Sequence, residues 1–387
     1  MIYLCCRKAY YVLKQYFFPK GESMTKTIVF TGGGSAGHVT PNMALFPQLL
    51  SEGYDIHYIG TENGIEKSLI ENMEGITYHS VSADKLRRYF SLKTLKMPFE
   101  VIKGINQATR IIKNLRPDVV FSKGGYVSVP VVIAAKNCKV PVVTHESDYT
   151  PGLANKISAR YADKICVTFE DTLQYVGKKG IHTGTPIRPQ LYRGNKQKGL
   201  EFLGFDDKKP VLMIMGGSLG AAAVNDAVRG ALDKLERTFD IVHLCGKGKL
   251  MPELDSCSYR QFEYISKELP DVFAATDIVI SRAGANAVFE LLALCKPMLL
   301  VPLPLSASRG DQIQNAGYFS RKGYAMVLEQ EKMTPQTLLD AVNDLYDRRL
   351  SFISTMSAEP TADGTDEVLD VIRKEAKEHE NSKREGK

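Results

Sequence analysis

The chain lacks the features that mark a membrane-spanning or disulfide-built protein. No apolar run approaches the roughly 20 residues that a membrane-spanning helix needs. The seven cysteines are scattered and form no C-x-x-C pair. They therefore indicate reduced thiols of a cytosolic protein and not a disulfide framework.

Neither positive nor negative charge dominates the chain. The 387 residues are 44% hydrophobic and 24% charged, which is typical of an ordinary globular protein, and the length indicates two domains. The net charge of +6 is compatible with nucleic acid, an anionic membrane or a phosphorylated substrate, and does not choose among them.

What the chain does contain is a set of glycine-rich junctions. The string TGGGSAGHVTP, residues 31–41, follows the strand-like run Thr27–Phe30 and precedes a helical pattern over Asn42–Ser51. A glycine-rich turn between a strand and a helix presents backbone N–H groups and a positive helix end, and both favour a phosphate or another anion. His38 stands at the start of that helix, within reach of whatever the loop binds.

Two further junctions repeat this arrangement. MGGSLGAAAVN, residues 215–225, follows the strand-like run Val211–Met215, and SKGGYVSVP, residues 122–130, follows Val119–Phe121. Three such junctions predict two similar α/β halves.

Strand-like and helical runs alternate through both halves, which predicts two Rossmann-like, doubly wound parallel sheets. In the first half the expected strands are 27–30, 55–59, 77–81, 119–121, 141–144, 164–167 and 181–183, and in the second half 211–215, 241–245, 261–264, 278–280, 298–301 and 325–328. Two open α/β domains place a ligand cleft between them.

The expected domain boundaries follow from composition. We expect an N-terminal domain over 24–190, a polar linker over 191–209, a C-terminal domain over 210–360, and a C-terminal helix with a charged tail over 361–387, disordered from Glu380. The first 23 residues differ in composition from the rest. They predict a mis-assigned start, with Met24 as the true first residue. The alternative is a membrane-surface amphipathic helix.

Seven motifs together resemble the MurG family of glycosyltransferases. They are TGGGSAGHVTP (31–41), SKGGYVSVP (122–130), HESDYTPGLANK (145–156), GTPIR (184–188), GGSLGAAAVN (216–225), SRAGANAVFEL (281–291) and DQIQNA (311–316). The resemblance extends from Lys26 to about Asp370, in matching order and spacing. It implies a two-domain GT-B fold with an interdomain cleft.

The resemblance also implies an activity. It is inverting transfer of N-acetylglucosamine from UDP-N-acetylglucosamine to the muramyl-pentapeptide of lipid I, which yields lipid II for peptidoglycan. The protein is then a peripheral protein on the cytoplasmic side of the cell membrane. We expect no nucleic-acid partner and no cofactor. Because no Asp-x-Asp motif is present, we also expect no metal.

Carried over residue by residue, the resemblance implies a donor site made by Ser35, Ala36, Gly37, Asp148, Arg188, Ser218, Ile265, Ala285, Asn286, Ala287, Val288, Phe289, Glu290 and Gln312. In this set Arg188 and Ser218 meet the diphosphate, Ile265 the uracil, Glu290 the ribose and Gln312 the sugar. Gly124, Gly125 and Tyr126 are assigned to the acceptor and its diphosphate. Taken singly, Arg188 favours a linker ion pair and Gln312 a solvated side chain, and the shared order of the motifs reverses this preference.

Inverting transfer needs a base for the acceptor hydroxyl, and His38 is the candidate because an imidazole titrates near neutral pH. A helix N-terminus there should lower its pKa. Asp148 and Glu146 are the alternative bases.

The chain departs from the family pattern at three places. The family usually has Thr-Gly where this chain has Ser35-Ala36, usually Asn where it has Asp148, and often Asn where it has Thr185. Ala36 should disfavour a positive φ. Asp148 brings a carboxylate near a diphosphate, which is repulsive unless the carboxylate is protonated or paired.

The segment KLRRYFSLKTLKMPFEVIK, residues 85–103, mixes basic and aromatic side chains. Such a mixture is typical of contact with an anionic membrane, for which we expect Lys85, Arg87, Arg88, Phe90 and Lys93. The alternative is an ordinary amphipathic helix with a solvated basic face.

Other functions remain open at this point. They are a different GT-B enzyme, such as a diacylglycerol glycosyltransferase or a UDP-N-acetylglucosamine 2-epimerase, a nicotinamide-dependent oxidoreductase, and a non-catalytic sugar-nucleotide sensor.

Overall fold

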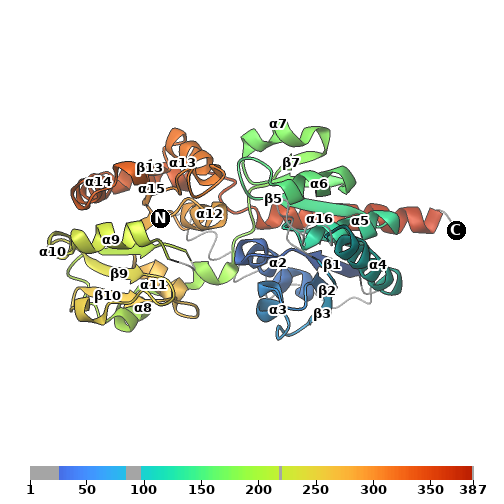
Figure 1. Ribbon diagram of the computed structural model, residues 1–387, viewed down its shortest axis with the longest axis horizontal. Coiled ribbons are helices and arrows are strands. Elements are labelled where there is room, and N and C mark those ends of the chain that lie inside the picture. The colour runs from blue at the N-terminus through green and yellow to red at the C-terminus, as the bar shows by residue number, and fades with distance from the viewer. Residues whose placement is uncertain (1–25, 84–96, 218–219, 386–387) are drawn as a thin grey trace. The chain divides into compact units, whose positions relative to one another are not determined.

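The computed structural model describes residues 26–83, 97–217 and 220–385 (Figure 1). The chain divides into two compact units. The first unit ends at Ile187 and resumes at Asp363, and the second unit runs from Arg188 to Ala362.

The first unit is built on a seven-stranded sheet in the order β3-β2-β1-β4-β5-β6-β7, and all its strand pairs are parallel. All seven expected strands are present, and their ends differ by one or two residues. Their bounds are Thr27–Thr31 (β1), Asp55–Gly60 (β2), Ile76–Ser80 (β3), Val119–Ser122 (β4), Val142–Glu146 (β5), Lys164–Val167 (β6) and Gly180–His182 (β7).

Helices cover both faces of this sheet because successive strand residues point to opposite sides. Ile28 and Phe30 of β1 pack in a cluster with helices α2 and α16, whereas Val29 packs in a second cluster with α4 and α5. The helices of this unit are Thr40–Ser51 (α2), Ile65–Ile70 (α3), Met97–Leu115 (α4), Ser128–Asn137 (α5), Leu153–Tyr161 (α6), Leu173–Val176 (α7) and Thr365–Glu385 (α16).

The second unit repeats the design with a six-stranded parallel sheet in the order β10-β9-β8-β11-β12-β13. Its six expected strands are also present, at Val211–Met215 (β8), Asp240–Leu244 (β9), Tyr259–Phe262 (β10), Ile278–Ser281 (β11), Met298–Leu300 (β12) and Ala325–Val327 (β13). Its helices are Lys196–Leu203 (α8), Ala222–Gly230 (α9), Leu232–Leu235 (α10), Leu269–Ala275 (α11), Ala285–Ala293 (α12), Asp311–Arg321 (α13), Pro335–Asp347 (α14) and Arg349–Ser357 (α15).

Each sheet contains one point where the strand order reverses. In the first unit this point lies between β1 and β4, and in the second between β8 and β11. Loops that leave the carboxyl ends of two such strands diverge to opposite faces and leave a crevice, which is where ligands bind in open α/β sheets. All three glycine-rich junctions leave a strand that borders one of these two points.

The structure differs from the expected linker. Helix α8 occupies Lys196–Leu203 within the segment 191–209, with Asn195 as its N-cap and Gly204 in the left-handed region at its C-cap. Its apolar side, Leu200 and Leu203, is buried against the second unit, where α8 contacts α11. The segment's many charged residues suggested a linker because they lie on the exposed side of a short amphipathic helix.

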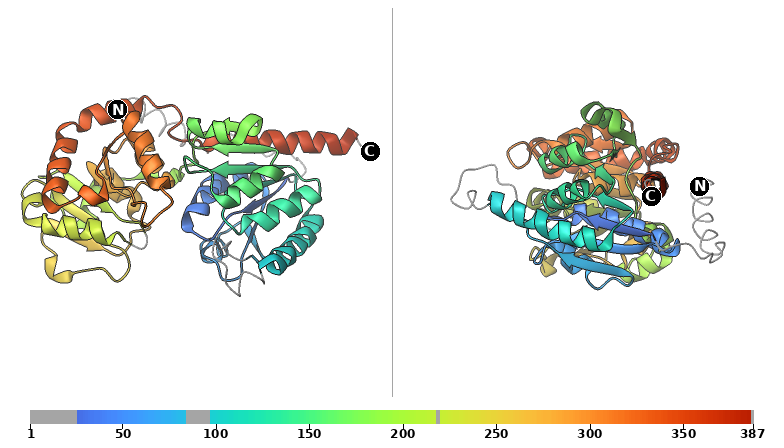
Figure 2. Two further views of the ribbon diagram at one scale, coloured as in Figure 1. Left: turned by 45° about the horizontal axis from the view of Figure 1, so that its top comes forward. Right: turned by 90° about the vertical axis from the view of Figure 1, so that its right-hand side faces the viewer.

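The C-terminal tail also differs from expectation. The structure continues α16 to Glu385, where we expected disorder from Glu380, and α16 packs on the first unit (Figures 1 and 2). Leu369 and Ile372 are fully buried. On its polar side Arg373 pairs with Glu52 at 2.6 Å, and Lys383 with Asp118 at 3.3 Å. A charged helix is stable here because its apolar stripe completes a core formed far away in the sequence.

Candidate functional site

The crevice of the first unit is formed by three loops that follow β1, β4 and β5. The loop after β1 contacts the loop after β4 directly, since the Gly33 N–H donates to the Gly124 carbonyl at 3.3 Å. A Cβ on Gly125, whose φ is +82°, would lie 2.2 Å from the Gly33 carbonyl oxygen. A Cβ on Gly124, φ +92°, would lie 2.1 Å from Asn155 Oδ1 at the start of α6. Gly125 thus lets the two loop backbones approach, and Gly124 leaves room for the Asn155 side chain, at distances that a Cβ would not permit.

The glycine-rich loop after β1 is less open to an anion than its sequence suggested. The Gly33 N–H is used by Gly124, and the Gly34 N–H donates to Glu66 Oε2 at 3.1 Å. Glu66 is fully buried and also accepts the Thr61 N–H at 3.0 Å. A protein carboxylate therefore supports the loop, and the N–H groups of Gly33 and Gly34 are used within the protein and not by an anion.

His38 does not cap a long helix as expected. Ala36–His38 is a single 3-10 turn, and α2 begins two residues after His38, at Thr40. Ala36 takes a negative φ inside this turn, so the replacement of the usual glycine introduces no left-handed strain. His38 is half-buried, and its Cδ2 would lie 3.0 Å from a Cβ on Gly125. The structure therefore brings His38 beside the loop after β4.

A buried polar cluster lies where β4 and β5 end. Lys123 and His145 are both fully buried, and the Lys123 Nζ donates to His145 Nδ1 at 2.7 Å and also to Ser147 Oγ. His145 Nε2 lies 2.9 Å from the Gly184 carbonyl, so this nitrogen carries the proton. Burial, together with the Lys123 charge, holds the pKa of His145 well below its usual range. His145 is therefore a fixed neutral acceptor and not a base for a substrate.

Glu146 is the second buried charge in this cluster. It accepts hydrogen bonds from Asn155 Nδ2 at 2.7 Å, from the Asp148 N–H at 3.0 Å and from the Gly152 N–H at 3.2 Å. Burial and then the charge of Asp148 raise the pKa of Glu146 to about 7. Glu146 and Asn155 also line a cavity of about 100 Å³ beside α6. The cluster therefore holds a carboxyl group that can gain or lose a proton near neutral pH.

In the second unit the structure brings two predicted donor residues together. Arg188 and Glu290 form a two-pronged pair, with Nε to Oε1 at 2.9 Å and Nη2 to Oε2 at 3.0 Å. Their side chains are 27% and 14% exposed, so the pair is shielded but reachable. We expected Arg188 at a diphosphate and Glu290 at a ribose, and the structure shows each as the other's partner.

Helix α12 begins at Ala285, as expected for a diphosphate-binding helix start. Its N-cap, Gly284, contributes no side-chain cap, so no side chain there competes for the first-turn N–H groups. Val288 and Phe289 are buried, and Phe289 packs edge-on against Phe319 at 5.2 Å. Within the first turns of α12, Val288 and Phe289 can therefore contact a ligand only through their backbone. Asn286 and Ala287 are half-buried.

Two further donor candidates, Ile265 and Gln312, lie in the same unit. Ile265 follows β10 and is buried beside the exposed Tyr264. Gln312 lies in the first turn of α13, and its Oε1 accepts the Leu303 N–H at 3.1 Å, so it is not the solvated side chain of the alternative interpretation. Ser218 and the membrane candidates Lys85, Arg87, Arg88, Phe90 and Lys93 lie outside the described residues, as do residues 1–23.

Sequence reasoning missed Glu66, Lys123 and Asn155. Lys123 and Asn155 were inside quoted motifs, but no local signal distinguished them from solvated side chains. Glu66 lies 32 residues from the glycine that it holds. The expected anion site rested on a glycine-rich turn and the helix start after it, and two of its N–H groups are used within the protein. Among the residues that the structure describes, no group of three or more His, Cys, Asp or Glu could hold a metal ion.

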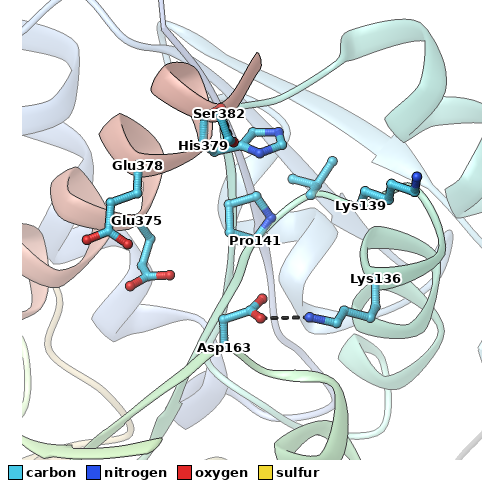
Figure 3. Close-up of a pocket in the computed structure, with 9 residues that line it drawn as sticks. Lys136, Lys139, Pro141, Asp163, Glu375, Glu378, His379 and Ser382 are labelled. Carbon is cyan, nitrogen blue, oxygen red and sulfur yellow. Dashed lines mark hydrogen bonds and ion pairs between the residues drawn. The ribbon is translucent and has the colours of Figure 1, made fainter. Parts of the chain in front are cut away.

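Figure 3 shows a pocket of about 370 Å³ elsewhere in the first unit, lined by Lys136, Lys139, Val140, Pro141, Asp163, Glu375, Glu378, His379 and Ser382. Pro141 and Asp163 directly precede β5 and β6, so the pocket lies at the amino ends of the strands. Lys136 and Asp163 pair within it at 2.7 Å. Because ligands of parallel α/β sheets bind at the carboxyl ends, we do not assign the site here.

Comparison with known proteins assigns both units. Residues 28–167 match the glycosyltransferase family 28 N-terminal domain, and residues 211–372 match its C-terminal domain. The chain is 53% identical over 353 residues to the UDP-N-acetylglucosamine–N-acetylmuramyl-(pentapeptide) pyrophosphoryl-undecaprenol N-acetylglucosamine transferase of Clostridium tetani, covering 91% of this chain and 98% of that relative. It is 52% identical to the enzyme of the same name from Clostridium botulinum strain Alaska E43, covering 91% and 99%.

Solved structures agree with this result. The crystal structure of Acinetobacter baumannii MurG matches with a TM-score of 0.71 and 26% identity, covering 90% of this chain and 99% of that one. The glycosyltransferase of kitacinnamycin matches with a TM-score of 0.69 at 14% identity, which supports the fold alone. Gly32, Gly34 and Gly37 also satisfy the spacing of a nicotinamide-binding loop. The family matches, and not this spacing, exclude an oxidoreductase.

The contact between the loops predicts a specific sensitivity. Gly125 and Gly53 both have φ +82°, but a Cβ on Gly53 meets nothing within 4 Å. Gly53→Ala should therefore cost only the left-handed strain of about 1–2 kcal/mol. Gly125→Ala should cost roughly 1–3 kcal/mol more, because the Gly33 carbonyl must move. Urea unfolding followed by circular dichroism measures both. Equal losses of stability would mean that the two loops separate freely.

Proposed function

The chain belongs to glycosyltransferase family 28, and we propose that it transfers N-acetylglucosamine from UDP-N-acetylglucosamine to lipid I to give lipid II. The observation that carries this assignment is the 53% identity to the Clostridium tetani enzyme across nearly the whole of both chains. The residues of each unit support it, because the first unit places titratable groups at its own crevice and the second pairs Arg188 with Glu290 on the helix that follows β11.

The chemistry divides between the two units. Inverting transfer needs a base for the acceptor hydroxyl and a group that stabilises the departing UDP. His38, beside the Gly124–Gly125 loop, is our proposed base. The Arg188 guanidinium and the first turn of α12 are proposed to hold the diphosphate, since both favour a negative charge. Glu290 is proposed to accept hydrogen bonds from the ribose.

The assignment is tested with three acceptor conditions. Labelled UDP-N-acetylglucosamine is mixed with lipid I, with diacylglycerol, or with no acceptor, and the products are separated by chromatography. We expect label only in the lipid I product. Transfer to diacylglycerol, epimerisation without an acceptor, or donor binding without turnover would each replace our assignment with one of the alternatives.

We also propose that the protein acts at the cytoplasmic face of the cell membrane. None of the helices within the described ranges is both long enough and apolar enough to cross a bilayer. At the start of α4, Phe99 and Ile102 are 74% and 56% exposed. They follow the basic and aromatic segment 85–96, so an apolar surface continues the predicted membrane contact.

Charge reversal tests the membrane contact. Arg87, Arg88 and Lys93 changed together to Glu should weaken binding to anionic vesicles, since each basic residue near such a surface contributes about 1 kcal/mol. Vesicle sedimentation measures the change, and donor affinity measured without membrane should stay the same.

The control reverses three exposed basic residues of the second unit, Lys208, Lys234 and Arg237. This variant carries the same net charge, so a general charge effect would weaken both proteins equally. Equal vesicle binding by the segment variant and the parent would remove residues 85–96 from the interface.

The proposed role of Glu290 at the ribose is tested by measuring donor binding. Glu290→Ala should raise the KM for UDP-N-acetylglucosamine by roughly tenfold to a hundredfold, because a charged hydrogen-bond acceptor contributes about 1.5–3 kcal/mol. Glu331→Ala, which removes an exposed carboxylate from the same unit, is the matched control. A thermal melt accompanies the assay because Arg188 loses its partner. A donor KM equal to that of the parent would place Glu290 away from the ribose.

Two variants assayed side by side determine which residue acts as the general base. His38→Ala should lower kcat by about 10²–10⁴, the usual range for removal of a general base, with little change in donor affinity. The acid limb of its pH–rate profile should flatten. Asp148→Asn should be the milder change. If His38→Ala stays within a few-fold of the parent with its acid limb intact, His38 serves loop packing and a carboxylate is the base.

A further inference from the structure

Glu66 places a carboxylate where water does not reach it. The residue lies in the first turn of α3 and is 0% exposed. A glutamate is rarely buried completely, because a charge that leaves water must be compensated by other charges or by hydrogen bonds. The hydrogen bonds of Glu66 therefore indicate why the fold keeps a carboxylate at this position.

The two carboxylate oxygens of Glu66 serve two different loops. Oε1 accepts the Thr61 N–H at 3.0 Å and the Thr61 hydroxyl at 2.5 Å, both in the loop after β2. Oε2 accepts the Gly34 N–H at 3.1 Å, in the glycine-rich loop after β1. Strands β1 and β2 are neighbours in the sheet, so Glu66 joins the loops of two adjacent strands. A carboxylate fits this place because both of its oxygens accept, whereas an amide has only one acceptor oxygen.

Three glycines leave the space that the Glu66 side chain fills. A Cβ would lie 2.6 Å from its Cδ if added to Gly33, 2.8 Å from its Cγ if added to Gly60, and 2.0 Å from its Oε1 if added to Gly64. None of these three glycines has a positive φ, so their backbone conformation does not itself require glycine. What they provide is room for a buried carboxylate, contributed by three separate parts of the chain.

Gly34 is the point through which Glu66 can act on the candidate site. On one side its N–H is bound by Glu66, and on the other side a Cβ added to Gly34, whose φ is +83°, would lie 2.5 Å from Tyr126 Cε1. The chain then continues through a 3-10 turn that ends at His38. A shift of Gly34 would therefore be carried to the residue that lies beside the Gly125 loop.

We propose that Glu66 is a positioning residue for sugar transfer, which fixes Gly34 and thereby holds His38 where it can reach the acceptor hydroxyl. This inference rests on the proposed function, in which His38 is the base. Because Glu66 is enclosed, it acts through the loop and does not touch the substrate. A base is effective only within hydrogen-bond reach of the proton that it takes, and a misplacement of about 1 Å can lower the rate about a hundredfold.

A double-mutant cycle tests this coupling. Glu66→Gln keeps the shape of the side chain but leaves one loop without its acceptor, so kcat for transfer to lipid I should fall by about tenfold to a hundredfold. In the His38→Ala background the same substitution should lower kcat by less than about threefold, because the base that Glu66 positions is already absent. Two losses that add in full would overturn the proposal, since Glu66 would then act on some other part of the protein.

The matched control is Glu62→Gln. Glu62 is an exposed carboxylate on the same loop as Thr61, and it pairs with Lys67 at 2.5 Å. Its loss should leave kcat unchanged, because an exposed ion pair contributes little and does not reach the glycine-rich loop. A fall in kcat equal to that of Glu66→Gln would show that any change in this loop is harmful, and the specific role of Glu66 would be wrong.

A second variant keeps the test decisive if Glu66→Gln does not fold. Thr61→Val retains the shape of threonine and removes only the hydroxyl that donates to Glu66 Oε1. We expect kcat to fall by roughly threefold to tenfold, because the carboxylate loses one of its hydrogen-bond donors. This loss should also disappear in the His38→Ala background. A folded Thr61→Val protein with the kcat of the parent would contradict the proposal.

Hydrogen exchange separates this proposal from the function itself. Glu66→Gln should speed exchange of the Gly34 amide by about tenfold or more relative to Glu62→Gln, whether or not either protein transfers sugar. Faster exchange together with a harmless His38→Ala would mean that Glu66 holds the loop and that the assigned base is wrong. A damaging His38→Ala with unchanged exchange and additive losses would mean that the base is right and the positioning role is wrong.

Discussion

The reversal of strand order beside β1 and β8 is the constraint on which both candidate sites depend. In the first unit it sends the loops after β1 and β4 to opposite faces, so that a crevice opens above the sheet. The two loops at the rim of this crevice can approach because Gly125 carries no side chain, since a Cβ there would lie 2.2 Å from the Gly33 carbonyl oxygen. That close approach places His38 next to the Gly125 loop. Thus the fold creates the opening, and Gly125 lets the two loops meet at its rim.

Most of the fold could be predicted because buried parallel strands are short, continuous apolar runs in the sequence, and all thirteen were found. Helices α8 and the end of α16 were not predicted. In α8 the apolar residues Leu200 and Leu203 are few among charges, and only tertiary packing shows that they form a stripe. The end of α16, residues 380–385, has no apolar residue, and its Lys383 pairs with Asp118, far away in the sequence. The sequence interval that looked like a linker belongs to the second unit for the same reason.

Sequence motifs identified several residues of the candidate site, but they did not identify the residues that only the folded structure brings to it. Arg188 and Glu290 were each expected near the donor, but their pairing joins residues 102 positions apart in the chain. Glu66 and Lys123 could not be distinguished from surface charges, because a sequence does not show which charged side chain ends under a loop. Burial decides this, and burial depends on the packing of the whole unit.

The two units handle charge in opposite ways, and this difference follows from what each is proposed to bind. In the second unit Arg188 is paired with Glu290 through two hydrogen bonds, so a diphosphate that takes the guanidinium must replace a carboxylate. The replacement costs little if Glu290 gains ribose hydroxyls at the same time, because its hydrogen bonds are then exchanged and not lost. In the first unit the buried Lys123 instead donates to two neutral acceptors, His145 and Ser147. The proposed exchange would give the second unit specificity for a complete nucleotide, since a diphosphate without ribose would leave Glu290 unsatisfied.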